Sequence, residues 1–311
     1  MVSKLILHYK LFSLLLLFFH FGKSQNYIPL SDPFQCGVSK AYSIYATAEE
    51  VDVLVGYLAE CKDLEYLKII GFRPGSHWDV LFDVLGEHQK LKGLELYYNE
   101  GLKELSKKIS KNINLKTIKI VGNRRLNYND LFKKISKLKN LESLTLVDNK
   151  LTEIPDALGS IKQLKRLKVS GNEGVDYEKL ISKLNKIKNF EELSIPLNSL
   201  SEIPENINEL KNLKTLDIRK NYITGFPSTI SGLDSLEELK VEENIILDVP
   251  SELGKLKNIN IKYLSFDDDN TSVNTLEDLK TLFPNAKVEN KHDNKFIENK
   301  WREELSVGKP F

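Results

Sequence analysis

Residues 213–221 read LKTLDIRKN, and residues 236–244 read LEELKVEEN. Both stretches carry leucine-type side chains at the first, fourth and sixth positions and asparagine at the ninth. Residues 91–99 (LKGLELYYN) and 141–149 (LESLTLVDN) repeat the pattern. A unit of this size cannot bury its own apolar face, so successive units must stack around a shared core. The sequence therefore predicts a solenoid of repeats.

Five weaker copies continue the register at spacings of about 25 residues. They begin at Leu64, Leu115, Leu164, Phe190 and Ile261. One L-x-x-L occurs in many amphipathic helices, but nine copies in register form a strong signal, with Asn or Asp in eight of the nine ninth positions. Nine repeats are therefore expected over residues 64–290.

The pattern resembles the leucine-rich repeat family. The resemblance implies an α/β fold, a horseshoe-shaped leucine-rich repeat solenoid with a parallel β-sheet on the concave face and helices or turns on the convex face. Alternation in L-x-L supports this, because it turns two apolar side chains to one face of a short strand. The asparagines are interpreted as structural groups that bond turn backbone, not as ligands.

Two kinds of connection follow the strands. L-x-x-I-P stretches at Pro155, Pro204 and Pro227 predict an extended run or turn and then a short helix, because proline fixes φ and lacks an N–H. Residues 128–139 and 177–188 lack proline and carry apolar residues at helical spacing, which predicts full helices.

The first 24 residues have the layout of a secretory signal peptide. Lys4 and Lys10 precede an apolar run at 11–21, and a small-residue site ends at Ser24. The run is short for a bilayer span, so cleavage after Ser24 is expected and an uncleaved anchor is the alternative. After cleavage we expect no integral membrane span and a protein that is secreted or held at the cell surface or in the periplasm.

Residues 25–63 are predicted to form an N-terminal cap. Residues 41–45 suit an edge strand, and residues 47–50 look like a capping box that opens a helix. The two cysteines, Cys36 and Cys61, both lie in this segment. In an exported protein we expect them to form a disulfide, worth about 3 kcal/mol in the loop-entropy model. Two unpaired buried cysteines are the alternative.

At the other end, residues 276–288 predict a last helix and a closing strand. Residues 291–311 are predicted to be a C-terminal capping helix, because Ile297, Trp301 and Leu305 recur every four residues. A frayed tail is the alternative.

Composition and motifs argue against catalysis. The chain has 45 basic and 44 acidic residues, a formal net charge of +1, which disfavours nucleic acid as a partner. It contains no phosphate-binding glycine loop, no G-x-S-x-G and no H-E-x-x-H. Residues 267–270 (DDDN) lack the spacing of a calcium loop and are interpreted as a solvated acidic edge. No enzyme activity, cofactor or metal is therefore expected.

The register also predicts which side chains line the concave sheet. Tyrosines gather at the N-terminal end, valines and basic residues in the middle, and acidic residues at the C-terminal end. The candidate partner-binding residues are Tyr66, Tyr97, Tyr98, Lys119, Val121, Arg166, Lys168, Arg219, Lys240 and Glu242. Tyrosine is enriched at binding hot spots, although β-propensity alone also places it on strands.

Two functions fit this surface. The first is an exported, non-catalytic scaffold that recognises another protein through the concave sheet, as the resemblance implies. The alternative is a cell-surface adhesin or envelope component that binds glycan or cell wall, with tyrosines stacked on sugar rings.

Overall fold

The computed structural model describes residues 41–45, 51–71, 78–267 and 275–291. The chain divides into two compact units, one ending at Leu141 and the other beginning at Glu142. The predicted signal peptide, Cys36, the capping box at 47–50 and residues 292–311 lie outside the described residues. Among the described residues, no helix combines the length and apolar character that a membrane crossing requires.

The first unit contains parallel strands that pair in chain order. Its strands are β1 (Ala41–Tyr45), β2 (Tyr66–Ile70), β3 (Gly93–Tyr97) and β4 (Thr117–Val121). Its helices are α2 (Val51–Glu60), α3 (Trp78–Leu85), the 3₁₀ helix η3 (Lys107–Lys111) and α4 (Tyr128–Ile135). The register pairs Leu67 with Leu94 and Leu94 with Ile118, so the fourth position of each repeat meets the fourth position of the next.

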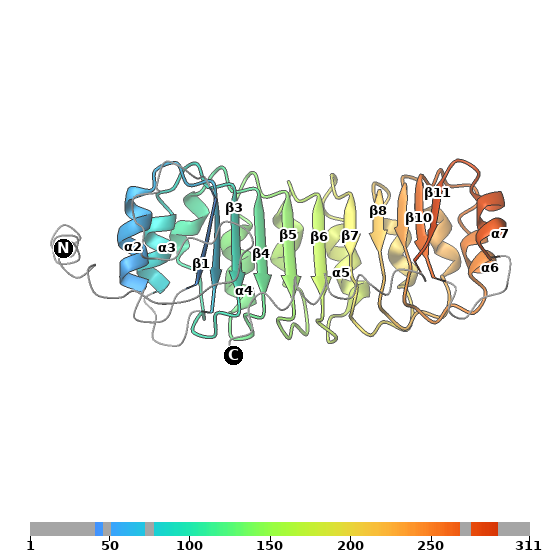
Figure 1. The fold of residues 1–311 in the computed structure, drawn as a ribbon, viewed down its shortest axis with the longest axis horizontal. Helices are drawn as coiled ribbons and strands as arrows, with labels where there is room; N and C mark the ends of the chain where they lie inside the picture. The colour runs from blue at the N-terminus through green and yellow to red at the C-terminus, as the bar shows by residue number, and fades with distance from the viewer. Residues whose placement is uncertain (1–40, 46–50, 72–77, 268–274, 292–311) are drawn as a thin grey trace. The chain divides into compact units, whose positions relative to one another are not determined.

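The second unit repeats this arrangement. Its strands are β5 (Ser143–Val147), β6 (Arg166–Ser170), β7 (Glu192–Ser194), β8 (Thr215–Asp217), β9 (Glu238–Lys240), β10 (Tyr263–Phe266) and β11 (Lys287–Asn290). Its helices are η4 (Asp156–Ser160), α5 (Tyr177–Leu184), η5 (Glu205–Glu209), η6 (Ser228–Gly232), α6 (Val249–Gly254) and α7 (Thr275–Leu282). Neighbouring strands are parallel throughout (Figure 1).

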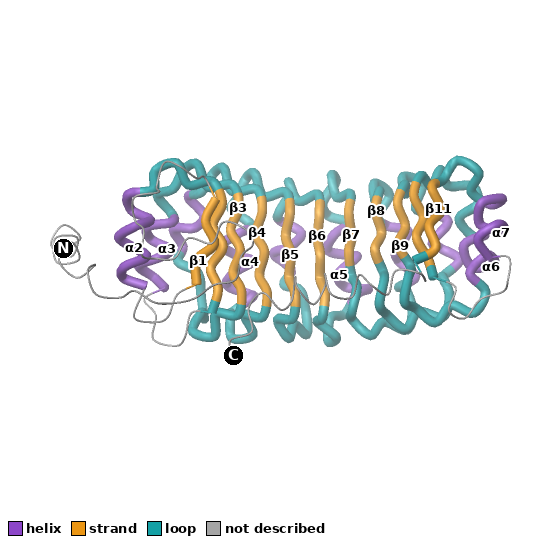
Figure 2. The backbone as a smooth tube through the Cα atoms, in the orientation of Figure 1, coloured by secondary structure: helices purple, strands orange, loops and turns teal. Residues whose placement is uncertain are grey.

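Helices and turns return the chain from one strand to the next, and α4 and α5 lie behind the strands in the view of Figure 2. The three prolines predicted to open short helices precede η4, η5 and η6. The proline-free segments form α4 and α5, where Asn127 and Asp176 accept hydrogen bonds from backbone N–H groups of the first turn. The predicted fold class, parallel strands alternating with helices or turns, is confirmed.

The core of each unit is built from the leucine positions of the repeat. Leu94 and Leu96 in the first unit, and Leu216 and Ile218 in the second, have no exposed surface. Alternation turns these side chains towards the helices and turns. The side chains between them lie on the other side of the sheet, the open face, where the helices do not cover them.

The asparagines form a buried ladder at the ends of the strands. Asn123 accepts a hydrogen bond from the backbone N–H of Asn99 (3.1 Å) and donates to the carbonyl oxygens of Leu96 and Val121 (both 2.8 Å). Asn198 makes the same contacts with Asn172, Val169 and Pro196. These side chains bond buried backbone groups of the strands and turns, which supports the structural interpretation of the asparagines.

Candidate functional site on the open face of the sheet

Tyr97 lies at the centre of the open face in the first unit. Lys68 of β2 and Lys119 of β4 place their Nζ atoms 4.3 and 5.2 Å from the centroid of its ring. Its hydroxyl group donates a hydrogen bond to Glu95 (3.1 Å). Both lysine contacts have cation–π geometry. Tyr97 therefore holds two cations in fixed positions above the sheet.

The sequence predicts Tyr97 and Val121 as exposed contact residues, and the structure differs. Tyr97 is 3% exposed and Val121 is 2% exposed, beside Ile70 at 2%. These three residues pair with one another across β2, β3 and β4, so they form one apolar row on the open face. Mutual packing along this row, together with the long lysine side chains, removes them from solvent.

Two glycines make room for the other two predicted tyrosines. A Cβ atom at Gly93 would lie 2.6 Å from Cδ1 of Tyr66, and one at Gly122 would lie 2.3 Å from Cδ1 of Tyr98. Gly122 also has a φ of +66°, which favours glycine. Tyr66 stays 47% exposed, whereas Tyr98 is half-buried. Tyr66 is therefore the most accessible of the three predicted tyrosines.

Charged side chains line the open face of the second unit, and Asp217 is held there by side-chain hydrogen bonds. Arg219 donates two hydrogen bonds to its carboxylate (2.8 and 2.9 Å), and Ser194 donates a third (2.9 Å). Burial acts to raise the pKa of Asp217, but the hydrogen bonds and charge of Arg219 outweigh it and hold the pKa below its usual value. Asp217 thus fixes the guanidinium of Arg219 over the sheet.

Glu242 is a predicted surface residue that the structure places in a buried position. It is 5% exposed, and its Oε2 atom lies 3.9 Å from Nε of Arg219. That oxygen receives no hydrogen bond within the described part of the chain. Burial raises the pKa of Glu242 above its ordinary value. Arg219 donates its hydrogen bonds to Asp217 and not to Glu242. Of these two carboxylates, Glu242 is therefore the one whose charge is poorly compensated.

The raised pKa predicts a pH-dependent effect of Glu242→Gln. Between the ordinary carboxyl value of 4.5 and the raised value, the folded state binds more protons than the unfolded state. Stability therefore falls as pH rises through this window, because the folded state must hold a buried charge. We expect Glu242→Gln to melt above the wild type at neutral pH and to lose this gain below pH 4.5.

Thermal melting across this pH range measures the effect. The matched control is Glu243→Gln, because the neighbouring Glu243 side chain is 55% exposed and pairs with Lys220. It should change the melting temperature little at any pH. A gain for Glu242→Gln that is equal at acidic and neutral pH would contradict the assigned cause.

The remaining predicted residues lie on the open face with different degrees of exposure. Arg166 is exposed and Lys168 is half-buried, both on β6. Lys240 forms an ion pair with Glu238 (2.9 Å) and lies 6.0 Å from the ring centroid of Tyr263. Nine of the ten predicted residues therefore lie on strands or shortly after them, and Tyr98 lies in the turn after β3. Some of the ten are exposed, some are paired with a neighbouring charge, and some are buried.

The sequence prediction missed a cluster around Glu289 on β11. Lys287, Lys291 and the hydroxyl of Tyr263 all contact its carboxylate, and the hydroxyl does so at 2.9 Å. Hydrogen bonds from Lys287, Lys291 and Tyr263 lower the pKa of Glu289 to about 2. The K-x-E-x-K spacing at 287–291 was the available signal, since alternate residues of a strand share a face.

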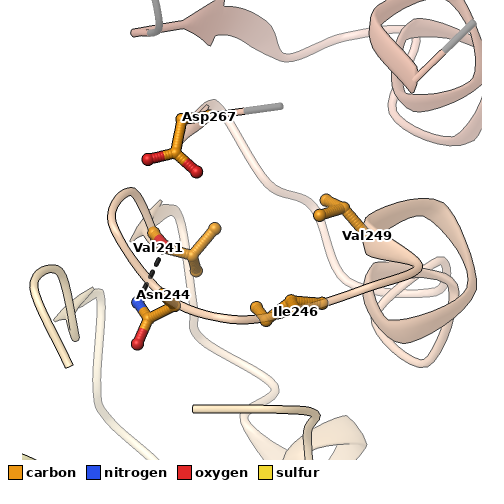
Figure 3. A pocket seen from close by; sticks show the side chains of 5 residues that line it. All are labelled: Val241, Asn244, Ile246, Val249 and Asp267. Carbon is orange, nitrogen blue, oxygen red and sulfur yellow. Dashed lines mark hydrogen bonds between the residues drawn. The ribbon is translucent and has the colours of Figure 1, made fainter. Parts of the chain in front are cut away.

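One small cavity lies among the described residues of the second unit. Figure 3 shows a cavity of about 10 Å³ lined by Val241, Asn244, Ile246, Val249 and Asp267, which is room for about one water molecule. Asn244 is already bonded there to the carbonyl oxygen of Val241 (2.8 Å). Among the described residues, no three His, Cys, Asp or Glu side chains are grouped to hold a metal ion. Residues 268–270 of the acidic run lie outside this part.

The comparisons with known proteins agree with the repeat architecture. Residues 183–305 match the family model described as a leucine-rich repeat region. This part of the chain is a leucine-rich repeat region. No curated protein matches it in sequence.

Two solved structures are similar to this chain. One is a leucine-rich repeat protein of Leptospira interrogans, 18% identical, with 80% of this chain and 89% of that chain covered and a TM-score of 0.32. The other is an internalin of Listeria monocytogenes, 17% identical, with 74% and 81% covered and a TM-score of 0.42.

Proposed function

We propose that this leucine-rich repeat protein is an exported, non-catalytic scaffold that recognises a partner protein through the open face of its sheet. The observation that carries the proposal is the fixed placement of charged groups on that face. Lys68 and Lys119 rest on Tyr97, and the guanidinium of Arg219 rests on Asp217. Side chains that are already ordered lose less entropy on binding, so they suit recognition.

Alternating charge adds specificity to this surface. Lys68, Glu95 and Lys119 lie side by side across β2, β3 and β4. A partner with the complementary order of charges is favoured, and a partner with like charges in those places is repelled. Such a pattern suits a folded protein surface, which presents charges at fixed spacing.

Glycan binding is the second candidate, and the structure supports it less. Stacking on sugar rings needs accessible aromatic faces, but Tyr97 is buried and Tyr98 is half-buried. Tyr66 is the accessible tyrosine among the three. Cross-linked capture of partners and a glycan array, run on the same protein, test the two candidates. Capture of one specific protein without glycan signals supports the proposal, and the reverse result favours the adhesin.

Tyr66→Ala is expected to weaken binding of the captured partner by about 2 kcal/mol, roughly thirtyfold. Tyr66 is an exposed aromatic side chain beside the ordered Lys68, and its removal leaves the core intact. Tyr97→Ala is a poorer test, because it would also release Lys68 and Lys119. Surface plasmon resonance with the purified partner measures the change.

The control for Tyr66→Ala is the double variant Glu104→Ala, Lys107→Ala, in the segment that carries η3. Both side chains are exposed and lie away from the strands. This variant should bind as the wild type does. If the control bound the partner more weakly and Tyr66→Ala bound it as the wild type does, the binding surface would lie on the helix side and not on the open face.

Export and the disulfide are parts of the same proposal. Cys61 is buried directly after α2, at 6% exposure, whereas Cys36 lies outside the described residues. We expect the secreted protein to begin near Gln25, with Cys36 and Cys61 bonded. Intact-mass spectrometry with and without reductant tests both points. Two free thiols in the exported protein would rule out the disulfide, and a mass that includes residues 1–24 would rule out cleavage.

A further inference from the structure

Four exposed apolar side chains gather in the turns that follow β7, β8 and β9, and we call them the edge patch. They are Leu197, Tyr222, Ile245 and Leu247, with exposures of 41, 58, 43 and 76%. Backbone hydrogen bonds join these turns: Tyr222 N–H donates to the carbonyl oxygen of Leu200 (2.7 Å), and Ile245 N–H donates to that of Ile223 (3.0 Å). The turns that carry the patch are therefore adjacent, and they lie at the arrowhead ends of the strands (Figure 1).

The other repeats show that these turns do not need apolar side chains. Tyr222 and Ile245 directly follow the ladder asparagine of their repeats. In the earlier repeats this place is taken by exposed polar residues, namely Glu100, Arg124, Lys150, Glu173 and Ser199. Leu247 likewise stands where the other proline-type repeats have Thr152, Ser201 and Thr224. The apolar residues are thus a departure confined to this edge.

Leu197 is the most unfavourable of the four for the fold. Its φ of +59° lies in the left-handed region, which side chains with a Cβ atom rarely adopt. Three other repeats place glycine at this point, namely Gly71, Gly122 and Gly171, all with positive φ. Tyr98, Asp148, Lys220 and Glu243 also adopt positive φ at this point of their repeats. Leu197 therefore combines a strained backbone conformation with a side chain that is 41% exposed.

Acidic side chains surround the edge patch. Glu202, Glu243 and Asp248 are exposed in the same turns, and Lys220, which precedes Asn221 there, is paired with Glu243 at 3.0 Å. We propose that the edge patch docks a segment of a partner protein in which apolar side chains are flanked by lysine or arginine. Apolar contact supplies the affinity and the acidic rim selects the basic flanks. This surface lies in the turns beside the open face, and the proposal does not depend on the function proposed for that face.

Three short fluorescent peptides test the proposal by anisotropy against the full-length protein. One alternates leucine with lysine, the second replaces each lysine with glutamate, and the third replaces each leucine with serine. The leucine–lysine peptide is expected to bind roughly tenfold more tightly than either of the others. Equal binding of the lysine and glutamate peptides would overturn the proposal.

Variants of the patch locate the binding. The double variant Tyr222→Ser, Leu247→Ser is expected to weaken the leucine–lysine peptide roughly tenfold. Leu197→Gly should also weaken it while melting no lower than the wild type, because glycine accepts the positive φ. The control is Ile113→Ser, which removes an apolar side chain of 56% exposure from the first unit and should leave binding unchanged.

Two further outcomes would contradict the proposal. Equal loss of binding in Ile113→Ser and the patch variants would show non-specific adsorption of the peptide. A dimer in light scattering that Leu247→Ser dissociates would identify a second copy of this chain as the occupant. Neither outcome would contradict the function proposed for the open face. That function is tested separately, by the binding of Tyr66→Ala to the captured partner.

Discussion

Replacing Asn172 with alanine is expected to lower the free energy of unfolding by roughly 4 kcal/mol. The side chain is completely buried. Its oxygen accepts hydrogen bonds from the backbone N–H groups of Asn149 (3.0 Å) and Leu151 (3.2 Å). Its nitrogen donates to the carbonyl oxygens of Leu146 (3.1 Å) and Ser170 (2.8 Å). Alanine would remove all four hydrogen bonds, at about 1 kcal/mol each.

Urea denaturation measures this loss, and two further variants show its origin. Asn172→Asp keeps the acceptor and removes the donor, so it should also be destabilising. Asn140→Ala is the control, because its amide makes an exposed hydrogen bond to the carbonyl oxygen of Ile113. We expect it to cost less than about 1 kcal/mol. Equal losses for Asn172→Ala and Asn140→Ala would contradict a structural role for the ladder.

Leu216→Ala is expected to cost roughly 2–5 kcal/mol, because Leu216 is fully buried in the core behind β8. Leu144→Ala removes the equivalent side chain behind β5 and should cost a similar amount. In a repeat protein each unit depends on its neighbours, so unfolding of adjacent repeats can accompany the loss.

Calorimetry of both core variants checks this expectation, with Leu247→Ala as the control. Leu247 is 76% exposed and contributes little to the core, so its removal should leave the melting temperature nearly unchanged. If Leu144→Ala and Leu216→Ala melted as the wild type does, the repeat register would be wrong.

The repeat register was sufficient to predict most of the fold. Leucine at the fourth and sixth positions identified Leu216 and Ile218 as core residues, because alternation in a strand leaves no other place for both. Proline at 155 predicted a short helical turn, and helical spacing at 128–139 predicted α4. These features are local, so one sequence contains the information for them.

The candidate site was harder to predict, because its geometry depends on contacts between repeats. Alternation places Tyr97 on the open face, but Lys68 and Lys119, from the strands on either side, contribute to its burial. Likewise, Glu242 has the sequence environment of an exposed residue, and only the structure shows it buried beside Arg219. The sequence assigns a residue to a face, whereas the lengths and charges of its cross-strand neighbours decide its exposure.

The left-handed residue before each ladder asparagine was also missed. Gly122 and Gly171 stand at this place, and Gly71 stands at the same point of the repeat that has Phe72 in the asparagine slot. This recurrence was a usable signal, since glycine tolerates positive φ. Tyr98 and Leu197 adopt the same conformation without being glycine. No propensity rule predicts such residues, because the repeat imposes the conformation on whatever residue stands there.

Lysine reactivity towards reductive methylation, compared between the protein alone and its complex with the captured partner, tests most directly that the open face is the recognition surface. Lys68, Lys119, Lys168 and Lys240 lie on that face, whereas Lys107, Lys133 and Lys257 are exposed on the helix side. We expect the first group to become protected in the complex and the second to react as before. Protection of the helix-side lysines, with the open-face lysines still fully reactive, would contradict recognition through the open face of the sheet.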